Sequence, residues 1–378
     1  GDSSDYVLLL AVLLGASCVT FDAGFNGRLN GTSVQCPGLG TTQAVTAEPR
    51  SGFTFKQWSD GNTDNPRTVQ GVLGNTTLTA EYATTGLKTV WIGYSFIRRS
   101  NAYVADIARD SAGFSDHVDQ MTFNSNCFGS PGQIYANASR RADAEGKIAA
   151  LKPDNVVLAY YTDIGSEYSD YVTWIDYTLT HAPEARFYIV SPWPNVTAGK
   201  GAGTSCSTAF RASPNFSDPV DPAALRAFTA ELTVEFETNV LSRLRSTYPD
   251  NDFFLIPQYE VAATILDAQL AGTLSYGPSQ DTLYTENKMS VAASNDTNSI
   301  FVDSGGHQGG VTSTGTAMLY MRYVYGMPIS NFDFWASKST YPPDTVIWNV
   351  GPPWPALSSY NGVDMVSSVD EIFSRYEE

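Results

Sequence analysis

The chain has 378 residues, 42% of them hydrophobic and 16% charged, which is enough apolar material for two packed domains. Asp and Glu outnumber Lys and Arg by 39 to 22, and the formal net charge is −17. A surface this acidic repels nucleic-acid phosphates and anionic lipid, so the composition excludes nucleic acid as a partner. No apolar run reaches the roughly 18–20 residues that a membrane span requires, so no span is expected.

The longest apolar run, Tyr6–Val19, has two interpretations. It is either the remnant of a secretion signal that ends at small residues or a buried β-strand, and we favour the strand. The four cysteines (Cys18, Cys36, Cys127 and Cys206) form no Cys-x-x-Cys pair, so no zinc site is expected. Pairing of the first two with each other, and of the last two, suits an exported protein. Six Asn-x-Ser/Thr sequons agree weakly with export.

Residues 1–86 are predicted to form a small all-β module. Short segments alternate apolar with polar residues, which is typical of half-buried strands, and Gly, Asn and Pro separate them. The predicted strands are 19–23, 44–49, 53–59 and 77–82.

From Lys88 to residue 378 the pattern changes to strands that alternate with helices. The predicted strands are 88–94, 117–123, 155–161, 186–191 and 252–257, and the predicted helices are 101–111, 134–151, 168–180 and 223–246. Continuous apolar strands that alternate with helices predict an α/β fold, a parallel five-stranded sheet with helices on both faces. Ligands bind beyond the carboxyl ends of the strands in such sheets.

Three residues from distant parts of the chain have the chemistry of a nucleophilic site. His307 lies in a glycine-rich loop, and Asp303 in the same loop can fix its tautomer. Ser95 follows the first predicted strand of the second domain and precedes its first helix, where a helix N-terminus favours a developing oxyanion. The other two histidines, His117 and His181, are interpreted as structural.

These residues resemble the SGNH (GDSL-like) hydrolases, which have a flavodoxin-like sheet and a Ser-His-Asp site. The sequence Ile92-Gly93-Tyr94-Ser95-Phe96 is similar to the nucleophile turn of that family, and residues 303–328 resemble its closing Asp-x-x-His block and helix. The resemblance implies Ser95 as nucleophile, His307 as general base and Asp303 as the acid that orients it. The separation of Asp303 and His307 is one residue longer than the family pattern.

The resemblance also implies an oxyanion hole. The second family block contributes a glycine N–H, and among residues 127–132 we favour Gly132 over Gly129. The third block falls on 160–163, where the usual asparagine is missing, so that Thr162, Asp163 or the nearby Asn126 would line the site instead. No metal and no organic cofactor is implied.

Residues 18–84 are similar to internalin B-repeat-like domains, small β-grasp modules of exported bacterial surface proteins. The phrases SGFTFKQWSDG and TLTAEY carry this resemblance, which implies export and contact with a cell surface or matrix. Asp60, Asn62 and Asp64 have the spacing of a calcium loop, but the glycine and glutamate that complete one are absent, so a turn is expected.

The expected function is a secreted or cell-surface serine esterase that removes acetyl or other short acyl groups from a polysaccharide through an acyl-enzyme. A short-chain lipid or aryl ester is the second substrate class, and acyl transfer to a sugar is not separated from hydrolysis. The alternative is a surface adhesion or carbohydrate-binding protein whose hydrolase fold is weakly active or inactive, and the missing asparagine favours it.

Overall fold

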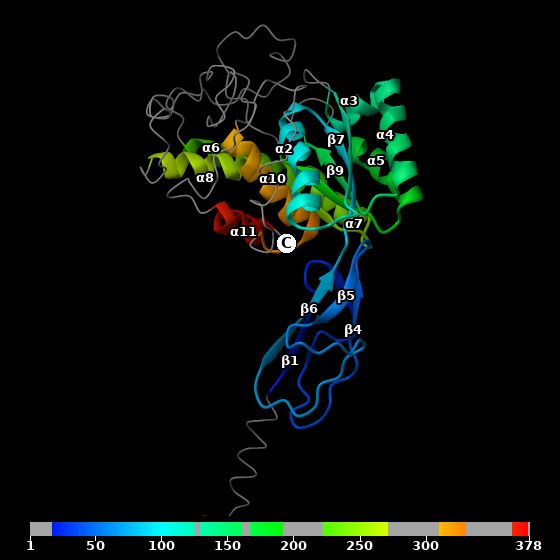
Figure 1. The fold of residues 1–378 in the computed structure, drawn as a ribbon, viewed down its shortest axis with the longest axis vertical. Coiled ribbons are helices and arrows are strands. Elements are labelled where there is room, and N and C mark those ends of the chain that lie inside the picture. Colours follow the sequence, from blue (N-terminus) through cyan, green and yellow to red (C-terminus); the bar gives the residue numbers. More distant parts are fainter. Residues whose placement is uncertain are drawn as a thin grey trace, which may run out of the picture. The chain divides into compact units, whose positions relative to one another are not determined.

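The computed structural model divides the chain into two compact units, Gly1–Thr85 and Gly86–Glu378 (Figure 1). It describes residues 17–124, 129–160, 167–191, 222–270, 310–329 and 365–376. The first unit is all-β and the second is α/β with a parallel five-stranded sheet, as the sequence predicts.

The first unit is built from a four-stranded sheet and a two-stranded sheet. The larger sheet has the order β3 (Val34–Gln35), β1 (Val19–Asp22), β6 (Thr76–Ala83) and β5 (Thr54–Trp58), and β2 (Gly27–Asn30) pairs with β4 (Thr46–Pro49). β1 and β6 are parallel neighbours, with Val19 opposite Thr76 and Asp22 opposite Thr79, while the other pairs are antiparallel.

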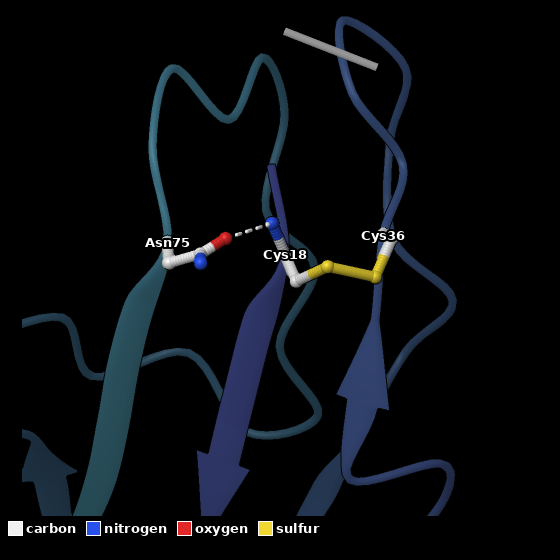
Figure 2. Close-up of a disulfide and its surroundings, with 3 residues drawn as sticks. All are labelled: Cys18, Cys36 and Asn75. Carbon is white, nitrogen blue, oxygen red and sulfur yellow. Dashed lines mark hydrogen bonds between the residues drawn. A yellow bond between two sulfur atoms is a disulfide. The ribbon is translucent and has the colours of Figure 1, made fainter. Parts of the chain in front are cut away.

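The core of the first unit surrounds Trp58, which is fully buried. Its ring centroid lies 5.5 Å from that of Phe21 and 5.8 Å from that of Phe55, and its indole N–H donates a hydrogen bond to the Asp64 carbonyl oxygen at 2.9 Å. The alternating pattern of β1 and β6 sends every second side chain into this core. A disulfide joins Cys18 to Cys36 at the edge of the sheet (Figure 2).

The sheet of the second unit is parallel throughout, and its three central strands are buried on both faces. Its order is β11 (Phe253–Ile256), β10 (Arg186–Val190), β9 (Asn155–Ala159), β7 (Lys88–Gly93) and β8 (Val118–Phe123). The runs KTVWIG, NVVLA and RFYIV explain this burial, because neither face alternates with polar residues.

Helices cover both faces of this sheet. One face packs on α3 (Pro131–Ala136), α4 (Ala138–Leu151), α5 (Tyr168–His181), η2 (Glu237–Leu241) and α7 (Ser242–Thr247). The remaining helices are α2 (Ser95–Asp106), η1 (Ile107–Ser111), α6 (Pro222–Phe236), α8 (Tyr259–Leu270), α10 (Gly310–Tyr325) and α11 (Met365–Tyr376). α10 packs against α2 and α11, and α6 packs against α8. Within the described ranges no helix is long and apolar enough to cross a membrane.

Two predicted helix boundaries were wrong. The helix predicted over 134–151 is two helices, because Asn137 ends α3 and its side-chain oxygen accepts the Arg140 N–H to cap α4. The helix predicted from Asn101 begins six residues earlier, at Ser95, and its last turn is a π-helix, η1, followed by Gly113 at a φ of 72°.

Candidate active site

Ser95 is the first residue of α2 and follows the carboxyl end of β7 by one residue, Tyr94. Its side chain is half-buried. The turn before it favours glycine, since a Cβ on Gly93 would lie 2.3 Å from Cδ1 of Ile97 and 3.0 Å from Cβ of Ala159. The local sequence therefore brings a serine hydroxyl to a strand end and a helix N-terminus at once, where free backbone N–H groups favour negative charge.

This turn lies where the strand order reverses. The chain passes from β7 to β8 on one side and then to β9 on the other, so the order counted from β7 is 2-1-3-4-5. Ligands of sheets with this order bind at the carboxyl ends of the first and third strands. The Tyr94 hydroxyl donates a hydrogen bond to the Tyr160 carbonyl oxygen at 3.1 Å, which ties the Ser95 turn to the end of β9.

Two glycines near this turn have different surroundings. A Cβ on Gly129 would lie 2.3 Å from Cβ of Tyr94 and 2.8 Å from the Gly93 carbonyl oxygen, so Gly129 touches the turn that carries Ser95. A Cβ on Gly132 would lie 2.5 Å from Oδ1 of Asp170, whose carboxyl pKa is raised by burial. Gly132 is thus packed on an acid of α5, whereas Gly129 is packed on the turn that carries Ser95.

The other five predicted site residues, Asn126, Thr162, Asp163, Asp303 and His307, lie outside the described residues. The cysteines Cys127 and Cys206 do as well, and so do residues 6–16 of the apolar run Tyr6–Val19. The structure therefore gives the positions of Ser95 and Gly132 but no distance from Ser95 to His307.

α10 runs antiparallel to the strands on the same side of the sheet as α2 (Figure 1). Its last residue, Tyr325, lies beside His117, just before β8 begins, and Tyr320 packs on Trp91 in the middle of β7 with ring centroids 5.1 Å apart. A helix advances 1.5 Å per residue. Gly310, the first residue of α10, is therefore at the carboxyl edge of the sheet, the edge that carries Ser95.

A buried hydrogen-bond chain fixes α10 at that edge. The Tyr320 hydroxyl donates to Oε1 of Gln258 at 2.7 Å, and Nε2 of Gln258 donates to the Ser191 carbonyl oxygen at 3.0 Å. Gln258 is fully buried directly after β11, and Ser191 follows β10. No sequence pattern predicts this hydrogen-bond chain, because neither a lone tyrosine nor a lone glutamine carries a signal.

His117 and His181 both form hydrogen bonds that hold the fold together, as expected from the sequence. His117 is buried, and its Nδ1 forms a hydrogen bond of 2.6 Å with the Tyr325 hydroxyl. Burial and the nearby Arg109 lower its pKa to about 4, so it is neutral at pH 7. His181 ends α5, and its Nδ1 contacts the Tyr177 carbonyl oxygen at 3.1 Å. Both lie away from the carboxyl ends of the strands.

Asp119 forms a second polar feature at the opposite edge from Ser95. It lies on β8, and its Oδ2 accepts a hydrogen bond from Nδ2 of Asn101 at 3.0 Å, while Oδ1 is buried with no hydrogen bond among the described residues. Burial raises the pKa of the Asp119 carboxyl to about 8. The sequence signal for this feature is an acid near the start of the predicted strand HVDQMTF.

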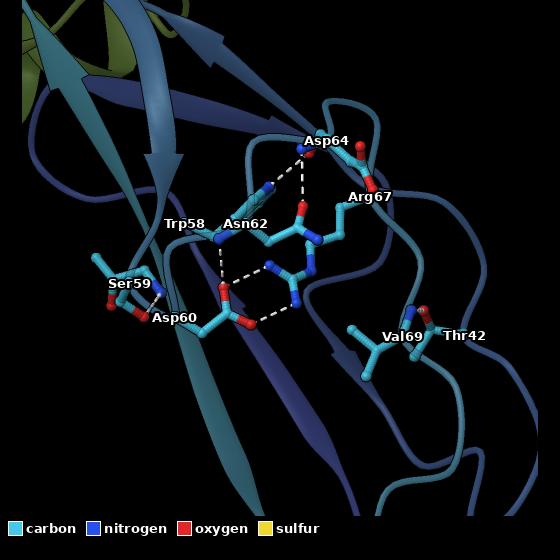
Figure 3. Close-up of polar contacts among 9 residues, drawn as sticks. Thr42, Trp58, Ser59, Asp60, Asn62, Asp64, Arg67 and Val69 are labelled. Carbon is cyan, nitrogen blue, oxygen red and sulfur yellow. Dashed lines mark hydrogen bonds and ion pairs between the residues drawn. The ribbon is translucent and has the colours of Figure 1, made fainter.

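The turn with calcium-like spacing in the first unit is occupied by arginine (Figure 3). Both carboxylate oxygens of Asp60 accept from the guanidinium of Arg67, at 2.6 and 2.5 Å, and Oδ1 of Asn62 accepts the Asp64 N–H at 2.7 Å. The expected turn is confirmed. In the parts of the chain that the structure describes, no group of three or more His, Cys, Asp or Glu side chains could hold a metal ion.

Comparisons with known proteins give one family match. Residues 17–86 match the family described as divergent InlB B-repeat domain, which agrees with the predicted resemblance over 18–84. No curated protein matches the chain. Among solved structures, a DUF4886 family protein from Bacteroides uniformis is 12% identical, with a TM-score of 0.38 over 69% of this chain and 88% of its own. The periplasmic domain of a lipopolysaccharide acetyltransferase from Salmonella ser. Paratyphi A is also 12% identical, with a TM-score of 0.35 over 65% of this chain and 85% of its own.

Proposed function

We propose that the second unit is an SGNH-like serine esterase with Ser95 as its nucleophile. The position of Ser95 carries the proposal, because it stands at the reversal of strand order and at the N-terminus of α2. A serine needs a base, and His307 precedes the first residue of α10 by three positions, with Asp303 four residues earlier. The direction of α10 supports this pairing, since its N-terminus lies at the edge that carries Ser95.

In the proposed reaction Oγ of Ser95 attacks the acyl carbon of an ester while His307 takes its proton. The proton then goes to the leaving alcohol, and the acyl group stays on Oγ. Water, deprotonated by His307, then attacks the acyl carbon, and His307 returns the proton to Oγ of Ser95 as the acid is released. Asp303 holds the imidazole in the required tautomer.

The oxyanion is assigned to backbone N–H groups of Ser95 and Gly132, with Thr162, Asp163 or Asn126 completing the hole. The contact of Gly129 with Tyr94 supports Gly129 as the competing glycine. One such donor contributes roughly 3–4 kcal/mol to transition-state stabilisation.

The proposed substrate is an acylated polysaccharide, acetylated ester groups first, and the setting is secreted or cell-surface. The disulfide and the InlB-type repeat of residues 17–86 support an exported protein. The alternative substrates are short-chain lipid or aryl esters. The alternative reaction is acyl transfer to a sugar.

The test is hydrolysis of p-nitrophenyl acetate and of acetylated polysaccharides by the wild type, Ser95→Ala and a control, Ser139→Ala. Ser139 is exposed in the first turn of α4 and should behave as the wild type. We expect Ser95→Ala to lose activity by a factor of at least ~10³. Equal activity in Ser95→Ala would reject the nucleophile. If the wild type hydrolyses none of these esters but binds the polysaccharide, the adhesion alternative replaces the esterase.

A further inference from the structure

Two buried backbone carbonyl groups lie where the pairing between β7 and β9 ends. The paired residues stop at Ile92 opposite Leu158, because the chain leaves β7 after Gly93 and enters α2. Ala159 and Tyr160, the next two residues after Leu158, are 0% and 5% exposed. Buried carbonyl oxygens need hydrogen-bond donors, so groups from outside this strand pair have to supply them.

Tyrosine hydroxyls donate to both of these carbonyl oxygens. The Tyr94 hydroxyl donates to the Tyr160 oxygen at 3.1 Å, and the Tyr171 hydroxyl donates to the Ala159 oxygen at 3.2 Å. Tyr94 and Tyr171 are themselves buried, with exposed fractions of 3% and 0%. The two donors have the same chemistry but belong to different elements, since Tyr94 lies in the turn before α2 and Tyr171 lies in α5.

The backbone of Tyr94 is held at the same time as its hydroxyl. A Cβ on Gly129 would lie 2.3 Å from Cβ of Tyr94 and 2.8 Å from its Cα, so the segment before α3 packs directly on this residue. The Tyr94 carbonyl oxygen accepts the Ile97 N–H at 3.2 Å, which closes the first turn of α2. Tyr94 therefore joins the ends of two strands to the start of the helix, and Ser95 is the next residue in the chain.

We propose that Tyr94 is a positioning residue for Ser95, and that its hydrogen bond to the Tyr160 oxygen fixes the backbone from which the serine hydroxyl projects. This inference rests on the proposed function, because it assigns a role within the proposed esterase site. Tyr94 and Ser95 are adjacent, so a change in the backbone dihedrals of Tyr94 moves the serine hydroxyl. A small displacement of a reacting group slows a reaction strongly, even when the substrate still binds.

The test compares Tyr94→Phe with Tyr171→Phe in the full chain, with p-nitrophenyl acetate as the substrate. Each variant removes one buried hydroxyl from one buried carbonyl oxygen, so a purely structural role predicts equal effects on activity. We expect Tyr94→Phe to lower kcat about 10-fold and to leave KM within about twofold of the wild type, because the ester binds but meets a displaced nucleophile. Tyr171→Phe should keep the wild-type kcat, and urea midpoints should show that both variants are folded.

Amide hydrogen exchange tests the same proposal without catalysis. The Ile97 amide, which is bonded to the Tyr94 carbonyl oxygen, should exchange about 10-fold faster in Tyr94→Phe and at the wild-type rate in Tyr171→Phe.

The two measurements separate failure of this proposal from failure of the esterase. The proposal is overturned if Tyr94→Phe keeps the wild-type kcat, if both variants lose kcat by the same factor, or if Ile97 exchanges equally in all three proteins. A wild type that hydrolyses no ester, together with faster Ile97 exchange in Tyr94→Phe alone, would reject the esterase and support the positioning of Ser95 by Tyr94.

Discussion

The two units are stabilised in different ways. The first unit buries a small core around Trp58 and adds a disulfide and an arginine–carboxylate pair. The second unit buries a five-stranded sheet on both faces, with Trp91 and Trp174 fully buried on separate sides. A small domain buries a smaller fraction of its surface and depends on cross-links, whereas a large one spreads its stability over many contacts. Equivalent changes should therefore have unequal consequences.

The largest difference is expected from removing a buried tryptophan in each unit. Trp58→Ala and Trp174→Ala should each cost about 3–5 kcal/mol. That loss is most of the stability expected for a unit this small, so Trp58→Ala should unfold the first unit alone, while Trp174→Ala leaves the second folded at 25 °C. Hydrogen exchange followed by mass spectrometry reads the units separately. Loss of protection in both units after Trp58→Ala would show that they fold as one.

Removal of the disulfide is the next largest effect. Cys18 and Cys36 close a loop with a sequence separation of 18, for which about 3 kcal/mol is expected. Cys18→Ser/Cys36→Ser should lower the urea midpoint of the first unit and leave that of the second unit unchanged. The matched control is the wild type under reducing agent, which should have the same urea midpoints as the variant. A change in the urea midpoint of the second unit would contradict the expectation that the two units unfold independently.

The stability of the second unit should fall as pH rises, because Asp119 is buried. The pKa of the Asp119 carboxyl is about 8 in the folded chain and about 4 in an unfolded one, so between these pH values the folded state holds a proton that the unfolded state has lost. Asp119→Asn should remove this slope and gain on the order of 2–3 kcal/mol at pH 8. Chemical denaturation from pH 4 to pH 8 measures it. An unchanged slope in the Asn variant would exclude Asp119 as its source.

Asp60 should give the first unit the opposite response, with the smallest size. The hydrogen bond from Arg67 lowers the pKa of the Asp60 carboxyl, so its stabilisation is present above pH ~4 and is lost as pH falls further. The Asp60 side chain is 42% exposed and solvent screens the pair, so Asp60→Asn should cost about 1 kcal/mol at pH 7. Asp64→Asn, an exposed neighbour, is the control in thermal melts. If Asp60→Asn and Asp64→Asn lose the same stability, the effect comes from the change in net charge and not from the Asp60–Arg67 pair.

The elements that the sequence predicted well have a strong pattern. Strands β7 to β11 lie within two residues of their predicted ranges, because continuous apolar runs bounded by polar residues leave little freedom. β2 and β3 were missed, since GRLN and VQ are short and polar and exist through pairing with distant strands. α8 was missed as well, because its start at Tyr259 follows β11 without a capping signal.

The sequence indicated where the candidate site lies along the chain, but not how the residues around it pack. The sequence predicted Ser95 at the junction of a strand and a helix, and the structure confirms that position, while its role as nucleophile stays a prediction. The contact of Gly129 with Tyr94, and that of Gly132 with Asp170, depend on how α3 packs beside β7 and α5, which no local pattern encodes. The pairing of His307 with Ser95 stays a prediction.

The parallel pairing of β1 with β6 has a mechanical consequence. Among the described residues these strands are the first and last of the unit and start at the same end, so the N-terminus of β1 and the C-terminus of β6 lie at opposite ends of one hydrogen-bonded pair. Tension applied along the chain slides the two strands past each other and loads the hydrogen bonds between Val19–Asp22 and Thr76–Thr79 together. Forced unfolding is governed by the unfolding barrier, which such shared loading raises. The first unit is therefore expected to resist tension applied through its two ends.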